Sequence, residues 1–277
     1  MQTNKTRTKR ISAKIKPSID RVSRITFDVT TARAPLESRV KLPDALGFEL
    51  AAAIEQQIIY LELKPGTHLI EQDVCDVFGV SRSPVREAFR HLEAGGLVVR
   101  YQRRGIRVTP MTEADLDELY TCRAPLEAIA AAAAARHATD HDIAEMRNAI
   151  EHMKTAFAER NIRDFFRFNI AFFDTMHKAA DNKTLLRILS VIERQASRYR
   201  YLAHSHSSSM LPFVLKGNSE IFQGISSRRP QQARSATLSV IVEARKIIMS
   251  ALREYASSDT PKRAAKANRA PRPHDRP

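Results

Sequence analysis

The stretch EQDVCDVFGVSRSPVREAFRHL, residues 71–92, decides the fold of the N-terminal part of the chain. Its first eight residues have the spacing of a short helix, which we expect to bury Val74, Val77 and Phe78. Gly79 then ends this helix, because glycine takes the left-handed C-cap conformation at little cost. A second helix follows after two residues, so the stretch predicts a helix-turn-helix.

The second helix of this motif has two faces. Its apolar residues fall at i, i+3, i+4 and i+7 and are expected to pack on the preceding helices: Val85, Ala88, Phe89 and Leu92. Arg82, Arg86 and Arg90 lie on another face, and arginine near the start of such a helix can donate paired hydrogen bonds to guanine in the major groove. Ser81 or Ser83 can cap the helix, and their hydroxyls suit phosphate oxygens. A face of ordinary solvated arginines is the alternative interpretation.

The flanking residues complete a domain over residues 42–112. Upstream, apolar residues at helical spacing predict a helix that Asp44 caps and Pro65-Gly66 ends: Leu46, Leu50, Ile54, Ile58 and Leu61. Downstream, residues 97–99 and 106–108 read as two strands joined by a turn that contains three residues suited to a wing: Arg103, Arg104 and Gly105. Arginine at such a tip suits the electronegative minor groove, whereas an ordinary surface hairpin is the alternative.

The formal net charge of +14 is concentrated at the two ends of the chain. Residues 1–41 carry +8 and residues 256–277 carry +4, and neither segment has an apolar period, so we expect two basic, disordered tails. Such tails fit attraction to nucleic acid and general solubility equally well. Residues 81–108 carry +5 directly after a segment of −6 over residues 42–80, which indicates an oriented basic surface.

Length and composition exclude several classes of protein. A chain of 277 residues is long enough for two domains. Two cysteines, Cys75 and Cys122, cannot form a disulfide framework and fit a reducing cytoplasm. The longest apolar run, residues 124–135, is too short to cross a bilayer, so we expect no membrane association. Because no Gly-rich phosphate loop, HExxH motif, paired CxxC or nucleophile elbow occurs, we expect no enzyme.

Residues 113–255 read as a second, almost entirely helical domain. Long amphipathic stretches alternate with brief polar breaks and predict six helices, at residues 113–136, 140–159, 163–180, 183–204, 211–227 and 231–254. These lengths and short connections predict an antiparallel bundle. The expected fold class is therefore mainly α, with an N-terminal winged helix-turn-helix and a C-terminal all-α antiparallel helical bundle.

The N-terminal domain resembles the winged helix-turn-helix of GntR-family transcriptional regulators. The resemblance rests on Pro65-Gly66, Leu69, the run from Phe78 to Ala88, Leu92, Gly96-Leu97-Val98 and Arg104-Gly105. It implies that major-groove and backbone contacts come from Ser81, Arg82, Ser83 and Arg86, and that the minor-groove wing tip comprises Arg103, Arg104 and Gly105. Many relatives have a DNA-contacting arginine where this chain has Gln72, which can still bond adenine or phosphate.

The C-terminal domain resembles the FCD effector domain of the FadR-type subgroup. The resemblance rests on residues 123–127, residues 166–182 and the final helices, and it implies a central cavity for a small ligand, commonly an organic acid. Many such domains also hold a divalent metal through one Asp and three His. The matching positions here are Asn169, Phe173, Asn218 and Val240 or Ile241, which are not a ligand set for such a metal, so we expect no metal and no cofactor.

A rearranged metal site is the alternative, through Asp174 and His177 at i, i+3 together with His204 and His206. Phe173 in place of a ligand instead favours a more apolar cavity and a more apolar acid as effector. The candidates for contacts to the effector are Arg123, Asn169, Phe173, Arg198, Tyr201 and Asn218. For the polar members of this set, structural hydrogen bonds are the alternative role.

The sequence thus predicts a cytoplasmic, ligand-responsive, sequence-specific transcriptional regulator, acting as a repressor of a metabolic operon. We expect a homodimer, because a two-fold dimer places two recognition helices on a palindromic operator in double-stranded DNA. Two alternatives are an architectural DNA-binding protein without an effector and an enzyme, metal-dependent or otherwise.

Overall fold

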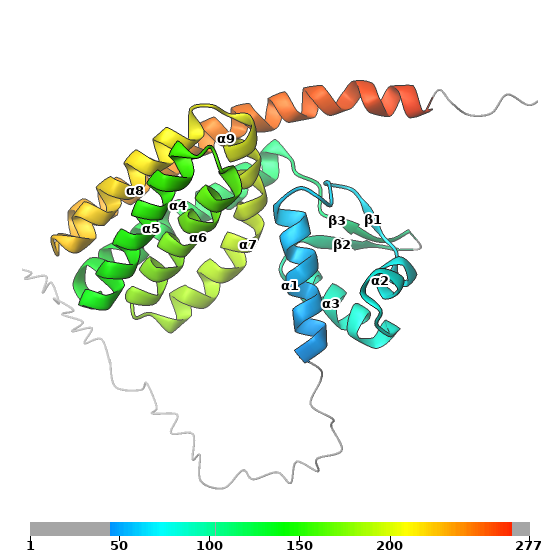
Figure 1. Ribbon diagram of the computed structural model, residues 1–277, viewed down its shortest axis with the longest axis horizontal. Coiled ribbons are helices and arrows are strands. Elements are labelled where there is room, and N and C mark those ends of the chain that lie inside the picture. The colour runs from blue at the N-terminus through cyan, green and yellow to red at the C-terminus, as the bar shows by residue number, and fades with distance from the viewer. Residues whose placement is uncertain (1–44, 103, 268–277) are drawn as a thin grey trace, which may run out of the picture. The chain divides into compact units, whose positions relative to one another are not determined.

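The computed structural model describes residues 45–102 and 104–267, which contain nine helices and three short strands (Figure 1). Residues 1–44, Arg103 and the chain from residue 268 onward lie outside the described residues, and with them the basic segment 1–41 and the predicted helix cap Asp44. The predicted fold class is confirmed: a small domain of three helices and a sheet comes first, and six long helices follow.

The N-terminal domain contains three helices and a three-stranded antiparallel sheet. The helices are α1 (Ala45–Ile59), α2 (Glu71–Phe78) and α3 (Arg82–Ala94), and the strands are β1 (His68–Leu69), β2 (Val98–Tyr101) and β3 (Gly105–Val108). The strand order is β1-β3-β2, with Leu69 opposite Ile106 and Val98 opposite Val108. The hairpin β2–β3 is the predicted wing, whereas β1 was not predicted.

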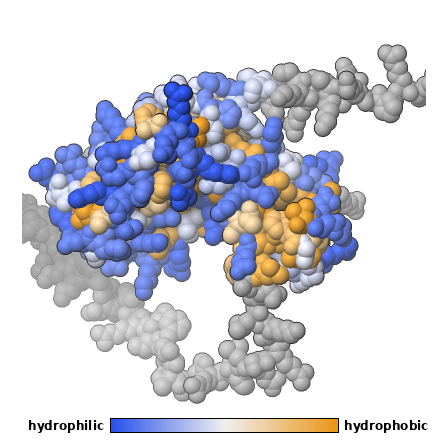
Figure 2. Space-filling view, in the orientation of Figure 1, coloured by the Kyte–Doolittle hydropathy of each residue, from blue (hydrophilic) through white to orange (hydrophobic). Residues whose placement is uncertain are grey.

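The core of this domain contains the predicted apolar faces of α1 and α3. Ile54, Ile58, Val85, Phe89 and Leu92 are almost fully buried. Gly79 has a φ of 66° and ends α2 as predicted. In the view of Figure 2 apolar residues gather over α1, where Leu46 and Phe48 are exposed.

The prediction for the buried face of α2 was wrong at two positions. Val77 is 76% exposed and Phe78 is 37% exposed, whereas Cys75 is buried. Val74 packs against the core as a partly buried residue. In a helix of two turns, rotation by one residue exchanges which side chains face the core, and here the small Cys75 side chain takes the inner position.

The prediction that Pro65-Gly66 ends α1 was also wrong. The helix already stops at Ile59, and Leu61 has a positive φ of 59°, which turns the chain out of the helix before Pro65 is reached.

The C-terminal domain is a bundle of six helices. They are α4 (Glu113–His137), α5 (Asp140–Ala158), α6 (Ile162–Ala179), α7 (Lys183–His206), α8 (Met210–Ser226) and α9 (Pro230–Ala267). Side-chain caps explain several starts: Thr112, Asn161 and Asn182 each accept a hydrogen bond from a first-turn amide, and Thr139 forms a capping box with Asp142. All predicted bounds lie within two residues of the observed ones except the last.

The last helix extends well beyond its predicted end at residue 254. It continues to Ala267, so residues 256–267 are helical, which corrects the expectation of a tail without secondary structure from residue 256. This segment contains Ala, Lys and Arg, which have high helix propensity, but also Pro261 and the run Ser257 to Thr260, which have low helix propensity.

Close approach of α8 to α9 depends on a glycine. A Cβ on Gly224 would lie 2.6 Å from the backbone nitrogen of Ala233. The alanines of α4 have a similar role, because Ala130, Ala131 and Ala134 are fully buried and their small side chains permit close helix packing. Within the described residues, no helix combines the length and the apolar composition needed to cross a membrane.

Candidate functional site

The start of α3 forms the candidate DNA-reading surface. Ser81 occupies the N-cap position with extended backbone angles, but its side chain accepts no capping hydrogen bond. Ser81, Arg82, Ser83 and Arg86 are all exposed on the same end of the helix, as predicted, whereas Pro84 is buried. The four side chains therefore lie together around the first turn, where backbone N–H groups also attract anions.

Residues of α2 hold both arginines of this surface. The guanidinium of Arg82 donates to Oε1 of Gln72 at 2.9 Å, and Gln72 donates to Asp76 at 2.8 Å. The Nε of Arg86 donates to Oε2 of Glu71 at 3.0 Å. Sequence reasoning missed these acidic partners, although the net charge of −6 before residue 81 was a signal. Gln72 thus lies beside the reading surface and orients Arg82.

The wing tip is shaped by Gly105. Its φ is 75°, and a Cβ at this position would lie 2.4 Å from Nε2 of His68 on β1. Arg104 is exposed, and its backbone N–H donates to the carbonyl of Tyr101 at 3.1 Å, which closes the turn. Arg103, the other predicted wing residue, lies outside the described residues.

Four of the six predicted effector residues surround one small cavity in the helical domain. Arg123, Asn169, Phe173 and Asn218 line a space of about 20 Å³, which is room for about one water molecule. The other walls come from α4, α7, α8 and α9: Tyr120, Arg200, Met210, Val214, Val240, Ile241 and Ala244.

The other two predicted effector residues, Arg198 and Tyr201, do not line this cavity. The guanidinium of Arg198 donates to the carbonyl of Thr109 at 2.7 Å, and burial lowers its pKa. The ring of Tyr201 packs edge-on against Phe166, with ring centres 5.3 Å apart. Both side chains therefore have structural contacts away from the four that line the cavity.

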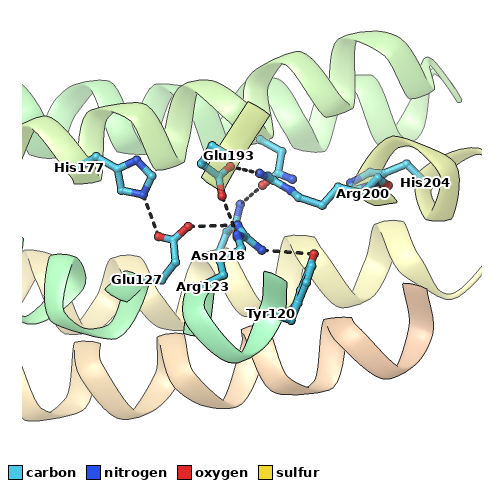
Figure 3. Close-up of polar contacts among 9 residues, drawn as sticks. Tyr120, Arg123, Glu127, His177, Glu193, Arg200, His204 and Asn218 are labelled. Atoms are coloured by element: carbon cyan, nitrogen blue, oxygen red, sulfur yellow. Dashed lines mark hydrogen bonds and ion pairs between the residues drawn. The ribbon is translucent and has the colours of Figure 1, made fainter. Parts of the chain in front are cut away.

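A buried ion-pair network lies against the cavity, and its members point toward one another from facing helices (Figure 3). Arg123 donates to Glu193 at 2.6 Å, to Tyr120 at 3.3 Å and lies 3.1 Å from a carboxylate oxygen of Glu127. Glu193 also pairs with Arg200. Two guanidinium groups and two carboxylates are thus balanced within the bundle.

These contacts shift the pKa values of the network. Burial favours the neutral form of Glu193, but the adjacent positive charges of Arg123 and Arg200 outweigh it and hold the pKa of this carboxyl far below its usual range. Burial also disfavours the charged form of His177, yet the Glu127 carboxylate 2.7 Å from its Nε2 outweighs this effect and raises the pKa of His177. The charged forms of Glu193 and His177 are therefore favoured.

Three polar atoms of the cavity-lining residues have no hydrogen-bond partner among the described residues: Nη2 of Arg123, Nη2 of Arg200 and Oδ1 of Asn218. The first lies 3.1 Å from a carboxylate oxygen of Glu127 in an ion pair, which leaves the Nη2 donor of Arg200 and the Oδ1 acceptor of Asn218. Arg200 is 3% exposed and Asn218 is 1% exposed, so water at the surface does not satisfy them. Because buried unpaired polar groups are costly, this donor and acceptor mark the cavity as a place where a polar ligand or water binds.

His204 lies near this network as a neutral side chain. Its Nδ1–H donates to the carbonyl of Arg200 at 2.6 Å, and burial lowers the pKa of His204 to about 3. Its ring packs near Phe165 and Phe166. The sequence suggested His204 only as a metal ligand, whereas the structure gives it a role in fixing α7.

Glu127, Glu193 and Arg200 were not among the predicted site residues. Glu127 follows Arg123 at i, i+4 on α4, a spacing that puts both side chains on one helical face and that was visible in the sequence. Glu193 and Arg200 lie at i, i+7 on α7, where a charged pair looks like an ordinary surface pair. Only the packing of α7 against α4 reveals that these charges are internal.

The cavity does not fit a divalent metal. Asn169, Phe173, Asn218, Val240 and Ile241, the positions matching the metal ligands of similar domains, all line it. Asn218 donates a hydrogen bond to the side-chain carbonyl of Asn169 at 2.9 Å. The side chains at the remaining positions have no atom that could ligate a metal.

The alternative metal ligands are not assembled either. His177 is bound to Glu127, and Asp174 is exposed. His206 donates its own Nδ1–H to the carbonyl of Leu202 at 3.0 Å. Within residues 45–102 and 104–267, no three His, Cys, Asp or Glu side chains form a group that could hold a metal ion.

Comparisons with known proteins assign both domains. Residues 47–108 match the family described as bacterial regulatory proteins, gntR family, and residues 118–244 match the FCD domain family. A probable D-xylose utilization operon transcriptional repressor of Paenarthrobacter nicotinovorans is 30% identical over 183 residues, covering 66% of this chain and 80% of that protein.

Two further comparisons extend over most of the chain. The HTH-type transcriptional repressor RspR of Escherichia coli (strain K12) is 24% identical over 193 residues, covering 70% of this chain and 84% of that protein. Among solved structures, E. coli McbR/YncC superposes with a TM-score of 0.68 at 18% identity, covering 75% of this chain and 99% of that one. The structural likeness supports the fold.

Proposed function

The chain belongs to the GntR family of bacterial transcriptional regulators and carries an FCD domain, and from this premise we propose that it represses a metabolic operon in response to a small effector. The proposal has two parts, a homodimer that reads a palindromic operator and a bundle cavity that receives the effector. Relatives that are named repressors, including one probable repressor of D-xylose utilization, favour repression. Bound to its operator, such a dimer excludes polymerase sterically.

The observation that carries the DNA-binding part is the exposed cluster on the first turn of α3. Ser81, Ser83 and the first-turn amides suit phosphate, while Arg82 and Arg86 suit paired hydrogen bonds to guanine. A single N-terminal domain offers few base contacts. A palindrome that binds the N-terminal domains of both copies supplies the affinity that a specific regulator needs.

The ligand class follows from the free donor and acceptor at the cavity. Arg200 offers an N–H and Asn218 offers a carbonyl oxygen, so the effector needs one acceptor group and one donor group a short distance apart. The apolar wall of Phe173, Val214 and Ile241 suits a short hydrocarbon part. A small hydroxy or amino carboxylic acid has these features, because its carboxylate can accept from the free N–H of Arg200 and its hydroxyl or amino group can donate to Asn218.

The cavity as it stands is too small for such a molecule. A space of about 20 Å³ holds about one water molecule, so the effector has to move the walls apart. Met210 and Val214 come from α8, and Val240 and Ile241 come from α9, so binding shifts these helices relative to α4 and α7. A ligand that binds the expanded arrangement better than the compact one changes the population of the two.

Selection of operators from a random DNA pool, followed by a thermal-shift screen, tests the proposal. We expect one palindrome to be enriched, and we expect small hydroxy or amino acids to raise the unfolding midpoint more than their uncharged amides do. Asn218→Leu, which removes the free acceptor, should abolish the response to the acids while operator affinity is retained. Binding that depends on salt but not on DNA sequence would instead support an architectural protein.

A further inference from the structure

We infer that the helical domain has a second small-molecule site, a groove beside Arg198 that binds a zwitterion through its carboxylate and its protonated amine. The groove has a volume of about 190 Å³ and is lined by side chains of α4, α7 and the segment that precedes α4, among them Thr109, Asp115, Glu118, Leu119, Arg198 and Tyr199. It shares no lining residue with the cavity beside Arg200 proposed for the effector, so this inference goes beyond the proposed function.

One wall of the groove forms where the segment of residues 109–112 lies against α7. The N–H of Thr112 donates to the phenol oxygen of Tyr199 at 3.3 Å, and Met111 packs against the core of the bundle. The Nη1 of Arg198 donates to the backbone carbonyl of Thr109 at 2.7 Å. These contacts hold Thr109 beside the guanidinium of Arg198.

Two polar atoms at this wall have no hydrogen-bond partner among the described residues. They are the Nε donor of Arg198 and the Oγ1 hydroxyl of Thr109. Both atoms are buried, and Arg198 as a whole is 2% exposed. Because an unpaired buried polar group is costly, a ligand with acceptor oxygens gains free energy by meeting them. A carboxylate has two such oxygens, and the Nε–H and the hydroxyl can each donate to it.

The positive charge of Arg198 also differs from that of the buried arginines beside the effector cavity. Arg123 and Arg200 each pair with Glu193. No carboxylate of residues 45–102 or 104–267 forms an ion pair with Arg198, and burial lowers the pKa of its guanidinium. A bound carboxylate supplies the negative charge that this wall lacks.

Two exposed carboxylates line the same groove from α4. Asp115 and Glu118 lie at i, i+3 on one side of the helix, and neither forms an ion pair with a described residue. The hydroxyl of Thr112 donates to Asp115 at 2.7 Å, which holds this carboxylate at the start of α4. Both carboxylates repel a ligand with negative charge alone, whereas they attract a protonated amine. A zwitterion is therefore complementary to the groove.

The volume of the groove sets the length of this zwitterion. A cavity of about 150 Å³ has room for benzene, so the groove accommodates an amino acid with a chain of about four to six carbon atoms. Leu119 and the ring of Tyr199 provide an apolar wall for that chain. Because the positive wall belongs to α7 and the carboxylates belong to α4, a chain with its charged groups at opposite ends fits better than an α-amino acid.

Calorimetric titration of the full chain with ω-amino acids, from 3-aminopropionate to 6-aminohexanoate, tests the site. We expect one chain length to bind most tightly. Replacing its amine by a methyl group, or its carboxylate by a carboxamide, should raise the dissociation constant by about tenfold, as expected for the loss of a charged hydrogen-bonding group.

Thr109→Val tests the positive wall without a change of shape. The Oγ1 that it removes has no partner in the structure, so the unfolding midpoint should not fall, while the dissociation constant of the amino acid should rise by about tenfold. Thr155→Val, at an exposed position of α5, is the matched control and should leave the dissociation constant unchanged.

Glu118→Gln tests the negative wall. It should raise the dissociation constant of the amino acid by about two- to fivefold, because the carboxylate is exposed. It should not weaken binding of the analogue that carries a methyl group in place of the amine. Glu145→Gln, at an exposed position of α5, should change neither value.

Binding that survives in Asn218→Leu, the variant that alters the effector cavity, supports a separate site. Binding that is lost in Asn218→Leu but unaffected by Thr109→Val and Glu118→Gln would place the amino acid in the effector cavity and overturn the groove, while the proposed function would stand. The absence of binding at every chain length would also overturn the groove. Failure to enrich any palindrome would overturn only the proposed function.

Discussion

The guanidinium of Arg86 has two competing partners. In the structure it donates to Glu71, and on DNA the same guanidinium has to face a base. We predict that Arg86→Ala weakens operator binding by about 1–3 kcal/mol and relaxes the preference at one base position. Competition binding with operators changed at single positions measures both effects. An equal loss of affinity on every sequence would assign Arg86 to the phosphate backbone instead.

Glu71 provides the converse test. Glu71→Gln keeps the size of the side chain, removes its charge and weakens its hold on Arg86, so we expect operator affinity to rise by about 0.5–1 kcal/mol. Both Arg86 and Glu71 are substantially exposed, which keeps the effect small. The double variant with Arg86→Ala should lose most of the gain. If it keeps the whole gain, the carboxylate acts by repelling phosphate and not through Arg86.

His177 gives the helical domain a stability that depends on pH. Because Glu127 raises the pKa of folded His177 above its ordinary value near 6.5, the protonated form stabilises the fold below that pH. This contribution is lost as the pH rises through the folded pKa. We predict that His177→Gln costs about 1–3 kcal/mol of unfolding free energy at pH 5.5 and clearly less at pH 8.5. Urea denaturation at both values measures it, and an equal cost would mean that His177 stays neutral.

The wing depends on the backbone conformation of Gly105. Gly105→Ala adds strain at a φ of 75° and brings a Cβ within 2.4 Å of His68, so we expect it to destabilise the N-terminal domain by about 1–3 kcal/mol. His68→Ala in the same chain removes the clash but not the strain, and should restore part of the loss. Chemical denaturation, monitored through a spectroscopic signal from the wing, measures the unfolding free energy of both variants. Full restoration would attribute the whole cost to His68.

Sequence patterns predicted long elements better than short ones. The six bundle helices have several turns of apolar period, and four of them begin at Thr or Asn caps, so their existence and approximate starts could be predicted. The eight residues of α2 offer too few turns to fix which side faces inward, and Cys75 instead of Val77 is buried. The two residues of β1 have no period at all, because pairing with β3 creates that strand.

In the candidate site, too, residues with a local sequence pattern could be predicted, whereas contacts between distant parts of the chain could not. Arg123, Asn169, Phe173 and Asn218 could be predicted because family motifs place them on helices that face one interior. The partner of Arg123 on α7 could not, because Glu193 is seventy residues away in sequence and has no local mark of burial. Long-range ion pairs become visible only once helices are packed together.

In the proposed function, effector and operator act on one equilibrium. We expect the effector to enlarge the compact cavity and so to select an arrangement of α8 and α9 that the operator-bound state disfavours. Thermodynamic linkage then requires equal effects in both directions. If a saturating acid from the thermal-shift screen lowers operator affinity by some factor, the operator lowers the affinity for that acid by the same factor.

We predict a factor of about 5–150 in each direction, as for typical allosteric coupling. Fluorescence anisotropy of labelled operator measures how the acid changes operator affinity. Calorimetric titration of the acid with and without operator measures how the operator changes the affinity for the acid. Asn218→Leu should lose the response of operator binding to the acid. The substitution removes Oδ1 of Asn218, which among the described residues is the one side-chain carbonyl oxygen at the cavity without a hydrogen-bond partner. An acid that binds this cavity yet leaves operator affinity unchanged would show that binding in the bundle does not affect DNA binding. Regulation would then have to begin at another surface.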